Sequence, residues 1–175
     1  MGMLRIDFAQ PSDARELVAL HDAVAAEVTA RLGQGHWSKL TRLERMRESI
    51  KRSDGQPSSR NVFVAREAGV IVATVTISHR GMHLWKRSLW EEPKEPGLAA
   101  FSLAVLPSRY RQGLGRIMMQ FTEEEAEDAG LKWVRLDAYT NNPDSNAFYQ
   151  ALGYANRGTQ WFGTVGIDLY EKRVG

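Results

Sequence analysis

The chain has 175 residues, with 23 lysines and arginines against 21 aspartates and glutamates, a formal net charge of +2, and no cysteine. Such a balanced charge argues against a nucleic-acid-binding protein, and the lack of cysteine excludes a disulfide scaffold and a thiolate zinc site. The length fits a single domain over residues 1–175. Because no apolar run is long enough to span a membrane and no signal peptide is visible, we expect a cytoplasmic protein without membrane partners.

Hydrophobic periodicity predicts five elements before residue 80. Alternating apolar and charged residues are typical of a strand, and apolar residues at three- and four-residue spacing are typical of a helix. We expect a strand over 4–8, a helix from Pro11 to Gly33, a helix from Ser38 to about Arg52, and strands over 61–67 and 70–79. The inward face of the second helix is assigned to Leu40, Leu43, Met46 and Ile50.

The remaining sequence predicts an irregular segment and then strands alternating with helices. The expected elements are an irregular segment over 80–97, a strand over 98–106, a helix ending at Gly130, a strand over 131–139, a short helix opened by Asn142-Pro143, and closing strands over 154–157 and 165–173 around a glycine-rich connection. Ala147, Phe148 and Ala151 are assigned to the inner face of the short helix.

The loop between the 98–106 strand and the following helix is the most informative stretch. Pro107 ends the strand, and Gly113 and Gly115 then lie in a basic turn that leads into the helix. The first N–H groups of a helix have no internal partner and carry partial positive charge, and glycine lets the backbone approach an anion closely. Charge is added by Arg109, Arg111 and Arg116. We therefore predict a phosphate or pyrophosphate ligand here.

Two common phosphate motifs are absent from this loop. The dinucleotide fingerprint needs a small residue where this chain has Met118, and no Gly-Lys-Ser/Thr sequence is present. The loop instead resembles the acetyl-CoA loop of the GCN5-related N-acetyltransferase (GNAT) superfamily, Gln/Arg-x-x-Gly-x-Gly/Ala. Gly113 and Gly115 match, whereas Tyr110 stands at the first position, so Arg111 is the candidate to supply the missing charge.

A second motif follows about 27 residues later and strengthens the resemblance. Asn142, Tyr149 and Gly153-Tyr154 fall where the family has an Asn, a Tyr seven residues on, and Gly-Phe or Gly-Tyr. The order of the expected elements is also that of the superfamily. The resemblance implies a mixed α/β (α+β) GNAT fold, with a central, mostly antiparallel sheet of six to seven strands and about four helices.

The resemblance also implies roles for individual residues. Backbone groups of Leu103, Ala104 and Val105 would bind the pantetheine arm of acetyl-CoA. The pyrophosphate would be held by Arg111, Gln112, Gly113, Leu114, Gly115 and Arg116. Asn142 would hydrogen-bond the cofactor, and Tyr149 would lie near its sulfur and protonate the departing thiolate. The alternatives are that Asn142 is a helix cap and Tyr149 a core residue.

The general base is harder to assign than the acid. Many family members carry a Glu on the strand before the glycine loop, but Ala99–Ser102 contain no carboxylate. Asp137, five residues before Asn142, is the best substitute, unless it pairs with a nearby cation. His79 and His83 are four residues apart on a predicted strand end, so we expect no metal site there and keep them only as alternative bases.

The implied activity is direct acetyl transfer from acetyl-CoA, as co-substrate, to a primary amine of a small molecule or protein, without a metal. A non-catalytic acyl-CoA-binding or regulatory module with the same fold is the alternative. The acceptor pocket is expected in the segments 34–60 and 80–97, which match no known pattern. Trp85 and Trp90 in the second segment either line that pocket or pack within the domain or against a second subunit, so a homodimer stays open.

Overall fold

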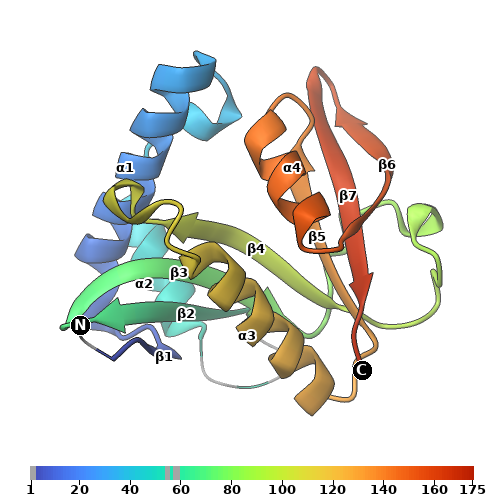
Figure 1. Cartoon of the computed structure of the whole chain (residues 1–175), viewed down its shortest axis with the longest axis horizontal. Coiled ribbons are helices and arrows are strands. Elements are labelled where there is room, and N and C mark those ends of the chain that lie inside the picture. Colours follow the sequence, from blue (N-terminus) through green and yellow to red (C-terminus); the bar gives the residue numbers. More distant parts are fainter. Residues whose placement is uncertain (1–2, 54–55, 57–59) are drawn as a thin grey trace. The chain divides into compact units, whose positions relative to one another are not determined.

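The computed structural model describes residues 3–53, 56 and 60–175 (Figure 1). Its strands and α-helices are β1 (Arg5–Phe8), α1 (Ala14–Leu32), α2 (Leu43–Lys51), β2 (Arg60–Glu67), β3 (Val70–Ser78), β4 (Leu98–Val105), α3 (Leu114–Asp128), β5 (Trp133–Tyr139), α4 (Pro143–Ala151), β6 (Ala155–Phe162) and β7 (Val165–Arg173). This is the predicted order of elements. Among the described residues, no helix is both long and apolar enough to cross a lipid bilayer.

The strands form a seven-stranded sheet in the order β1-β2-β3-β4-β5-β7-β6. β1 pairs with β2, β5 with β7, and β6 with β7 in antiparallel fashion, whereas β4 and β5 are parallel. The predicted fold, a mixed and mostly antiparallel sheet with four helices, is confirmed.

The chain forms two compact units. The first comprises Met1–Ile77 and Ser102–Gln120, and the second comprises Ser78–Phe101 and Phe121–Gly175. Strand β4 and helix α3 each contribute residues to both units, so the division falls inside two regular elements.

The first unit has a core of aliphatic side chains from its helices and strands. Leu17 and Leu20 of α1, Ile50 of α2, and Val64 of β2 are all buried in one cluster. Helical spacing on α1 and strand alternation on β2 place these residues on inward faces, as the sequence predicts.

A buried carboxylate, Asp13, accepts a 2.6 Å hydrogen bond from the backbone N–H of Gln10 at the start of the first helix.

The second predicted helix is shorter than expected. Helix α2 begins at Leu43, and the backbone of Arg42 is extended, with φ −86° and ψ 128°. The residues before Leu43 form hydrogen bonds outside an α-helix. The backbone N–H of Thr41 donates to Asp22, and Ser38 ends a 3₁₀ turn. Leu40 is therefore not an inward residue of a helix, and it is 72% exposed.

The second unit buries the tryptophans of the irregular segment 80–97. Trp85 and Trp90 are 5% and 4% exposed and lie in a cluster with Ile167 and Leu169 of β7. Their rings meet edge to face with centroids 5.7 Å apart. Packing within this part of the protein is thus the interpretation that the structure favours for both indoles.

Two expectations at the carboxyl-terminal end are wrong. Strand β6 runs on to Phe162, because Gly158, with φ +119°, lies at a register shift within the strand and is not part of a connecting loop. On α4, Ala147 and Ala151 are exposed, whereas Phe148 and Tyr149 are both half-buried, and the ring centroid of Tyr149 lies 5.9 Å from that of Tyr170.

Candidate active site

The glycine loop has a backbone conformation that is compatible with an anion site. Arg111 and Gly113 have positive φ angles of 61° and 81°, and they flank Gln112. The carbonyl of Gly113 accepts the first helical hydrogen bond, from the N–H of Ile117 at 3.0 Å, so the unbonded N–H groups of α3 follow directly. Arg111, Gln112, Gly113 and Arg116 are exposed, which leaves this helix start open to a ligand.

Arg109 stabilises the loop and does not add to its free positive charge. Its guanidinium forms an ion pair with Glu67 of β2, and its Nε donates to Gln112 Oε1 at 2.7 Å. The cations that the loop exposes are therefore Arg111 and Arg116.

Tyr110, at the position where the motif has Gln or Arg, is half-buried beside α1. Burial raises the pKa of its phenol, and the negative charge of Glu27 raises it further. The residue is therefore a neutral side chain that faces Glu27, and it offers no cation to a phosphate.

Strand β4 leads into the loop through an irregular residue that sequence patterns did not reveal. Ser102 has a φ of 50°, which is rare for a residue other than glycine and interrupts the strand conformation. Leu103 and Val105 are half-buried, and Ala104 is buried between them. An interrupted strand exposes backbone N–H and C=O groups that a regular ladder would use, which suits the predicted role of these three residues.

The second unit brings Asp137 together with Trp85 and two tyrosines. The indole Nε1–H of Trp85 donates to Asp137 Oδ2 at 2.6 Å. Burial raises the pKa of the Asp137 carboxyl, and the hydrogen bond from Trp85 opposes that rise only in part. Asp137 does not pair with a cation in the part of the chain that the structure describes, because Arg135 on the same strand face pairs with Glu171.

Tyr149 lies among aromatic rings on the inner side of α4. Its ring centroid is 6.0 Å from that of Tyr154 and 5.9 Å from that of Tyr170. Burial raises the pKa of its phenol well above the ordinary value, and the charge of Asp137 adds to this shift. The hydroxyl is therefore protonated at every physiological pH and can act as a donor.

Asn142 caps α4, which is the alternative that the sequence offered to a role in cofactor binding. Its Oδ1 accepts from the N–H of Ser145 at 3.3 Å, and its side chain is almost fully buried. The cap fixes the start of the helix that carries Tyr149.

The predicted residues thus fall into two groups, each within one compact unit. The first unit holds Leu103–Val105 and the loop Arg111–Arg116, and the second holds Asp137, Asn142 and Tyr149. His79 is half-buried and His83 is exposed. Across the described ranges, no group of three or more His, Asp and Glu side chains could hold a metal ion.

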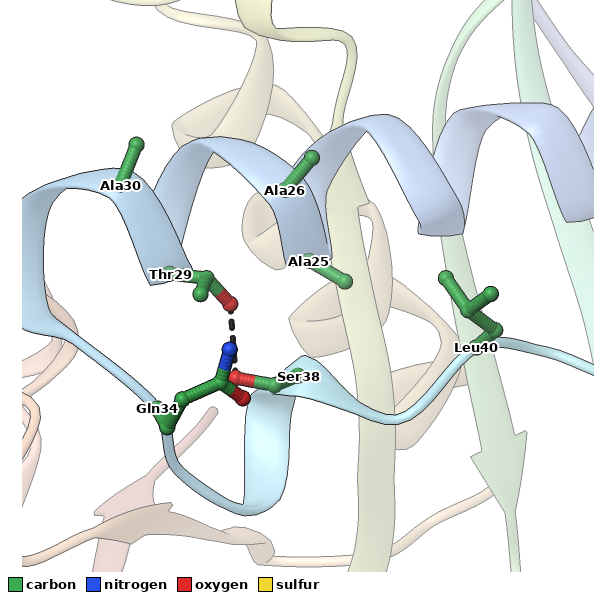
Figure 2. Close-up of a pocket in the computed structure, with 7 residues that line it drawn as sticks. All are labelled: Ala25, Ala26, Thr29, Ala30, Gln34, Ser38 and Leu40. Atoms are coloured by element: carbon green, nitrogen blue, oxygen red, sulfur yellow. Dashed lines mark hydrogen bonds between the residues drawn. The ribbon is translucent and has the colours of Figure 1, made fainter.

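A hollow of about 390 Å³ lies beside α1 in the first unit (Figure 2). It is lined by Ala25, Ala26, Thr29, Ala30, Gln34, Ser38 and Leu40. The hydroxyls of Thr29 and Ser38 hydrogen-bond each other at 2.7 Å across it. Three of its residues belong to the segment 34–60 expected to form an acceptor pocket, but the lining carries no charge that would select a charged group.

Residues 27–154 match the family model described as "Acetyltransferase (GNAT) family". The chain belongs to this family. The GNAT assignment rests on most of the chain, including both motifs, and it makes the protein an acyltransferase as the resemblance predicted.

Individual relatives agree with the GNAT assignment. The uncharacterized N-acetyltransferase YesJ of Bacillus subtilis is 26% identical over 143 residues, which are 81% of this chain and 75% of that protein. The ribosomal protein bS18-alanine N-acetyltransferase of Escherichia coli is 35% identical over 54 residues, 31% of this chain and 36% of that protein. The PaiA N-acetyltransferase of Thermoplasma acidophilum, solved with coenzyme A, has the same fold, with a TM-score of 0.74 at 14% identity over 98% of this chain and 99% of that one.

Proposed function

We propose that this GNAT protein transfers the acetyl group of acetyl-CoA directly to a primary amine of a small molecule or of a protein. The observation that carries the proposal is the pair of titratable groups in the second unit. Asp137 has a raised pKa and accepts one hydrogen bond, and Tyr149 has a raised pKa and stays protonated. Asp137 can accept a proton from the amine and Tyr149 can donate one to the leaving thiolate. Amine acetylation needs both of these steps.

Binding of acetyl-CoA is assigned to the groups that the motifs predicted. The start of α3, with exposed Arg111 and Arg116, suits the pyrophosphate, and backbone groups of Leu103–Val105 suit the pantetheine arm. That a structural relative was solved with coenzyme A supports this assignment. A backbone N–H of β4 is also suited to polarise the thioester carbonyl as negative charge develops on its oxygen.

Asp137 is assigned the role of general base. A lysine-like amine with a pKa near 10.4 costs roughly 4.6 kcal/mol to deprotonate at pH 7, whereas an α-amine near 7.7–8.0 costs only about 1–1.4 kcal/mol. A raised pKa brings the proton affinity of a carboxylate closer to that of the amine and makes it a better base. The neutral nitrogen then attacks the thioester carbon, and the C–S bond breaks. Tyr149 donates its proton to the departing sulfur, and the extra proton left on the nitrogen passes to the Tyr149 phenolate, which restores the neutral phenol.

The acceptor can be found with a panel of small amines, lysine side chains and peptide α-amines, using release of CoA as the signal. At least one class should support turnover, and Asp137→Asn and Tyr149→Phe should both lower it. Acetyl-CoA binding without turnover on any amine would instead favour the non-catalytic acyl-CoA-binding module.

A further inference from the structure

The irregular segment 80–97 is fixed on both sides of Trp85 by one side chain of β6. The Oε1 of Gln160 accepts from the backbone N–H of Lys86 at 2.7 Å, and its Nε2 donates to the carbonyl of Leu84 at 2.8 Å. Because these two bonds flank Trp85 in the chain, they hold the backbone that carries the indole.

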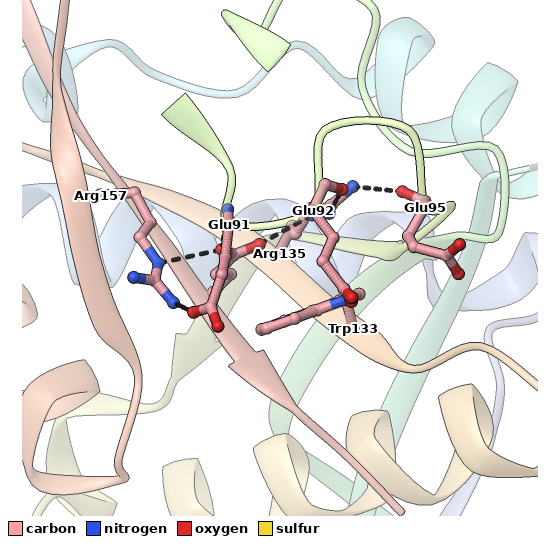
Figure 3. A network of polar contacts seen from close by, with 7 residues as sticks. Glu91, Glu92, Glu95, Trp133, Arg135 and Arg157 are labelled. Atoms are coloured by element: carbon pink, nitrogen blue, oxygen red, sulfur yellow. Dashed lines mark hydrogen bonds and ion pairs between the residues drawn. The ribbon is translucent and has the colours of Figure 1, made fainter. Parts of the chain in front are cut away.

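A network of charges holds the next part of the same segment (Figure 3). Glu171 of β7, whose side chain is 0% exposed, lies 3.1 Å from Arg135 Nε and 2.9 Å from Arg157 Nε. Glu171 also accepts from the backbone N–H of Glu91 at 2.7 Å, and Arg135 donates to the carbonyl of Glu92 at 3.0 Å. The segment is therefore tied to β5, β6 and β7 through charged side chains, of which Arg135 and Glu171 are buried and Arg157 is half-buried.

Trp85 contributes a hydrogen bond to Asp137 in addition to its packing contacts. Its ring packs edge to face against that of Trp90 in the aromatic cluster. Its Nε1–H, however, is a donor placed 2.6 Å from Asp137 Oδ2. A hydrogen bond to a carboxylate is stronger than one between neutral groups, and it favours the ionised form.

We propose that Trp85 is a positioning residue for Asp137. The indole N–H holds Oδ2 and so presents Oδ1 as the oxygen that takes the proton from the acceptor amine. The proposal rests on the proposed function, in which Asp137 is the general base. The proton leaves the amine nitrogen for Oδ1, and the nitrogen lone pair becomes available for attack on the thioester carbon. A carboxylate with one oxygen fixed loses less orientational freedom in that step.

The groups around Asp137, apart from the indole N–H of Trp85, are neutral or form an ion pair with another residue. Tyr139 on the same strand and Tyr149 on α4 have phenol pKa values raised by burial and by the Asp137 charge, so both remain neutral. Arg135, two residues back on β5, pairs with Glu171, and the partner of Asp137 across β7 is the uncharged Leu169. Loss of the Trp85 N–H should therefore change the pKa of the Asp137 carboxyl directly.

Trp85→Phe keeps an aromatic ring but removes the N–H donor, together with part of the indole's volume. The acidic limb of the kcat/KM profile should move up by about 1–2 pH units, because the lost hydrogen bond favoured the ionised form. Trp90→Phe is the matched control: it makes the same change in the same cluster but removes no bond to Asp137, so its acidic limb should stay at the wild-type pH. Gln160→Ala, which frees the backbone on both sides of Trp85, should move the limb in the same direction by less.

Asp137→Asn separates this proposal from the proposed function. If that variant keeps the wild-type acidic limb, Asp137 is not the base and the proposed mechanism fails. If it loses the limb while Trp85→Phe keeps it at the wild-type pH, the positioning role is overturned and the base assignment stands.

A carbon-13 NMR titration of the Asp137 carboxyl reads the same pKa in the whole protein without any acceptor. A rise in Trp85→Phe but not in Trp90→Phe supports the role of the indole. Equal values in both variants contradict it.

Discussion

At the scale of single residues, the second unit holds two groups whose surroundings suit them to the opposite proton-transfer roles that we propose. Both Asp137 and Tyr149 have raised pKa values, and burial is the main cause for each. For a carboxyl group this shift makes the carboxylate a stronger base, whereas for a phenol it keeps the proton in place. The same physical cause therefore suits Asp137 to accept a proton and Tyr149 to donate one.

Asp137→Asn should lower kcat/KM most strongly below the pKa of the acceptor amine and allow recovery at high pH, where the amine loses its proton without help. In the wild type, activity should rise with pH through a carboxyl pKa above the ordinary aspartate value, because burial raises it. The measurement is kcat/KM across pH for both proteins with one good acceptor. A loss that is equal at every pH would point to a structural role for Asp137.

Tyr149→Phe should lower kcat by about 10- to 1,000-fold, because it removes the proton donor and keeps the ring. Affinity for acetyl-CoA should change little, since the hydroxyl acts mainly as the thiolate develops. Tyr170→Phe is the matched control, because Tyr170 belongs to the same aromatic cluster and its hydroxyl donates to Asn146 at 2.6 Å. Wild-type kcat in Tyr149→Phe, with chemistry shown to limit the rate, would remove Tyr149 from the mechanism.

At the scale of elements, the glycine loop depends on backbone conformation more than on space. A Cβ on Gly113 would meet no atom within 4 Å, but its φ of +81° is strained for a β-branched residue. Gly113→Val should therefore distort the loop and lower the affinity for CoA at least tenfold.

Calorimetry of CoA binding tests the Gly113 prediction against a matched glycine. Gly130 has a φ of +69° and equally open surroundings, but it follows the other end of α3. Gly130→Val should carry a similar strain and bind CoA as the wild type does. Unchanged CoA affinity in a folded Gly113→Val protein would contradict the assignment of the loop.

The elements that the sequence predicted well depend on local patterns. The strand, proline, glycines and helix around Gly113 are consecutive, and so are Asn142 and the short helix that carries Tyr149.

The contact of Trp85 with Asp137 could not be predicted, because it joins residues 52 positions apart. The pairing of Arg135 with Glu171 spans 36 positions and depends on the register of β5 and β7. The late start of α2 was missed because Asp22 on α1 satisfies the backbone of Thr41.

At the scale of the whole molecule, we propose that residues 1–175 fold as a single domain. Strand β4 and helix α3 each lie partly in both compact units, so neither unit could keep all its regular elements alone. Unfolding should then be one cooperative transition that far-UV circular dichroism and tryptophan fluorescence report with the same midpoint. Two separated transitions would contradict the single domain.

Glu171→Gln should lower the free energy of unfolding by about 3–5 kcal/mol, because it leaves the guanidinium of Arg135 in a buried site without its counter-ion. Glu48→Gln is the control: its pair with Arg52 has a 3.6 Å separation and an exposed carboxylate, so it should change the free energy of unfolding by about 1 kcal/mol or less. Urea denaturation gives both values. Equal effects would mean that the Glu171 network adds little to stability.

The central claim, direct acetyl transfer to an amine, is tested most directly by a single-turnover measurement. The protein is mixed with less than one equivalent of acetyl-CoA, with and without an accepted amine, and CoA, acetylated amine and the intact mass of the protein are followed together. We predict that CoA and acetylated amine appear at one rate and only when the amine is present, with no acetylated protein on the way. An acetylated protein that forms without the amine and then passes its acetyl group on would contradict the account.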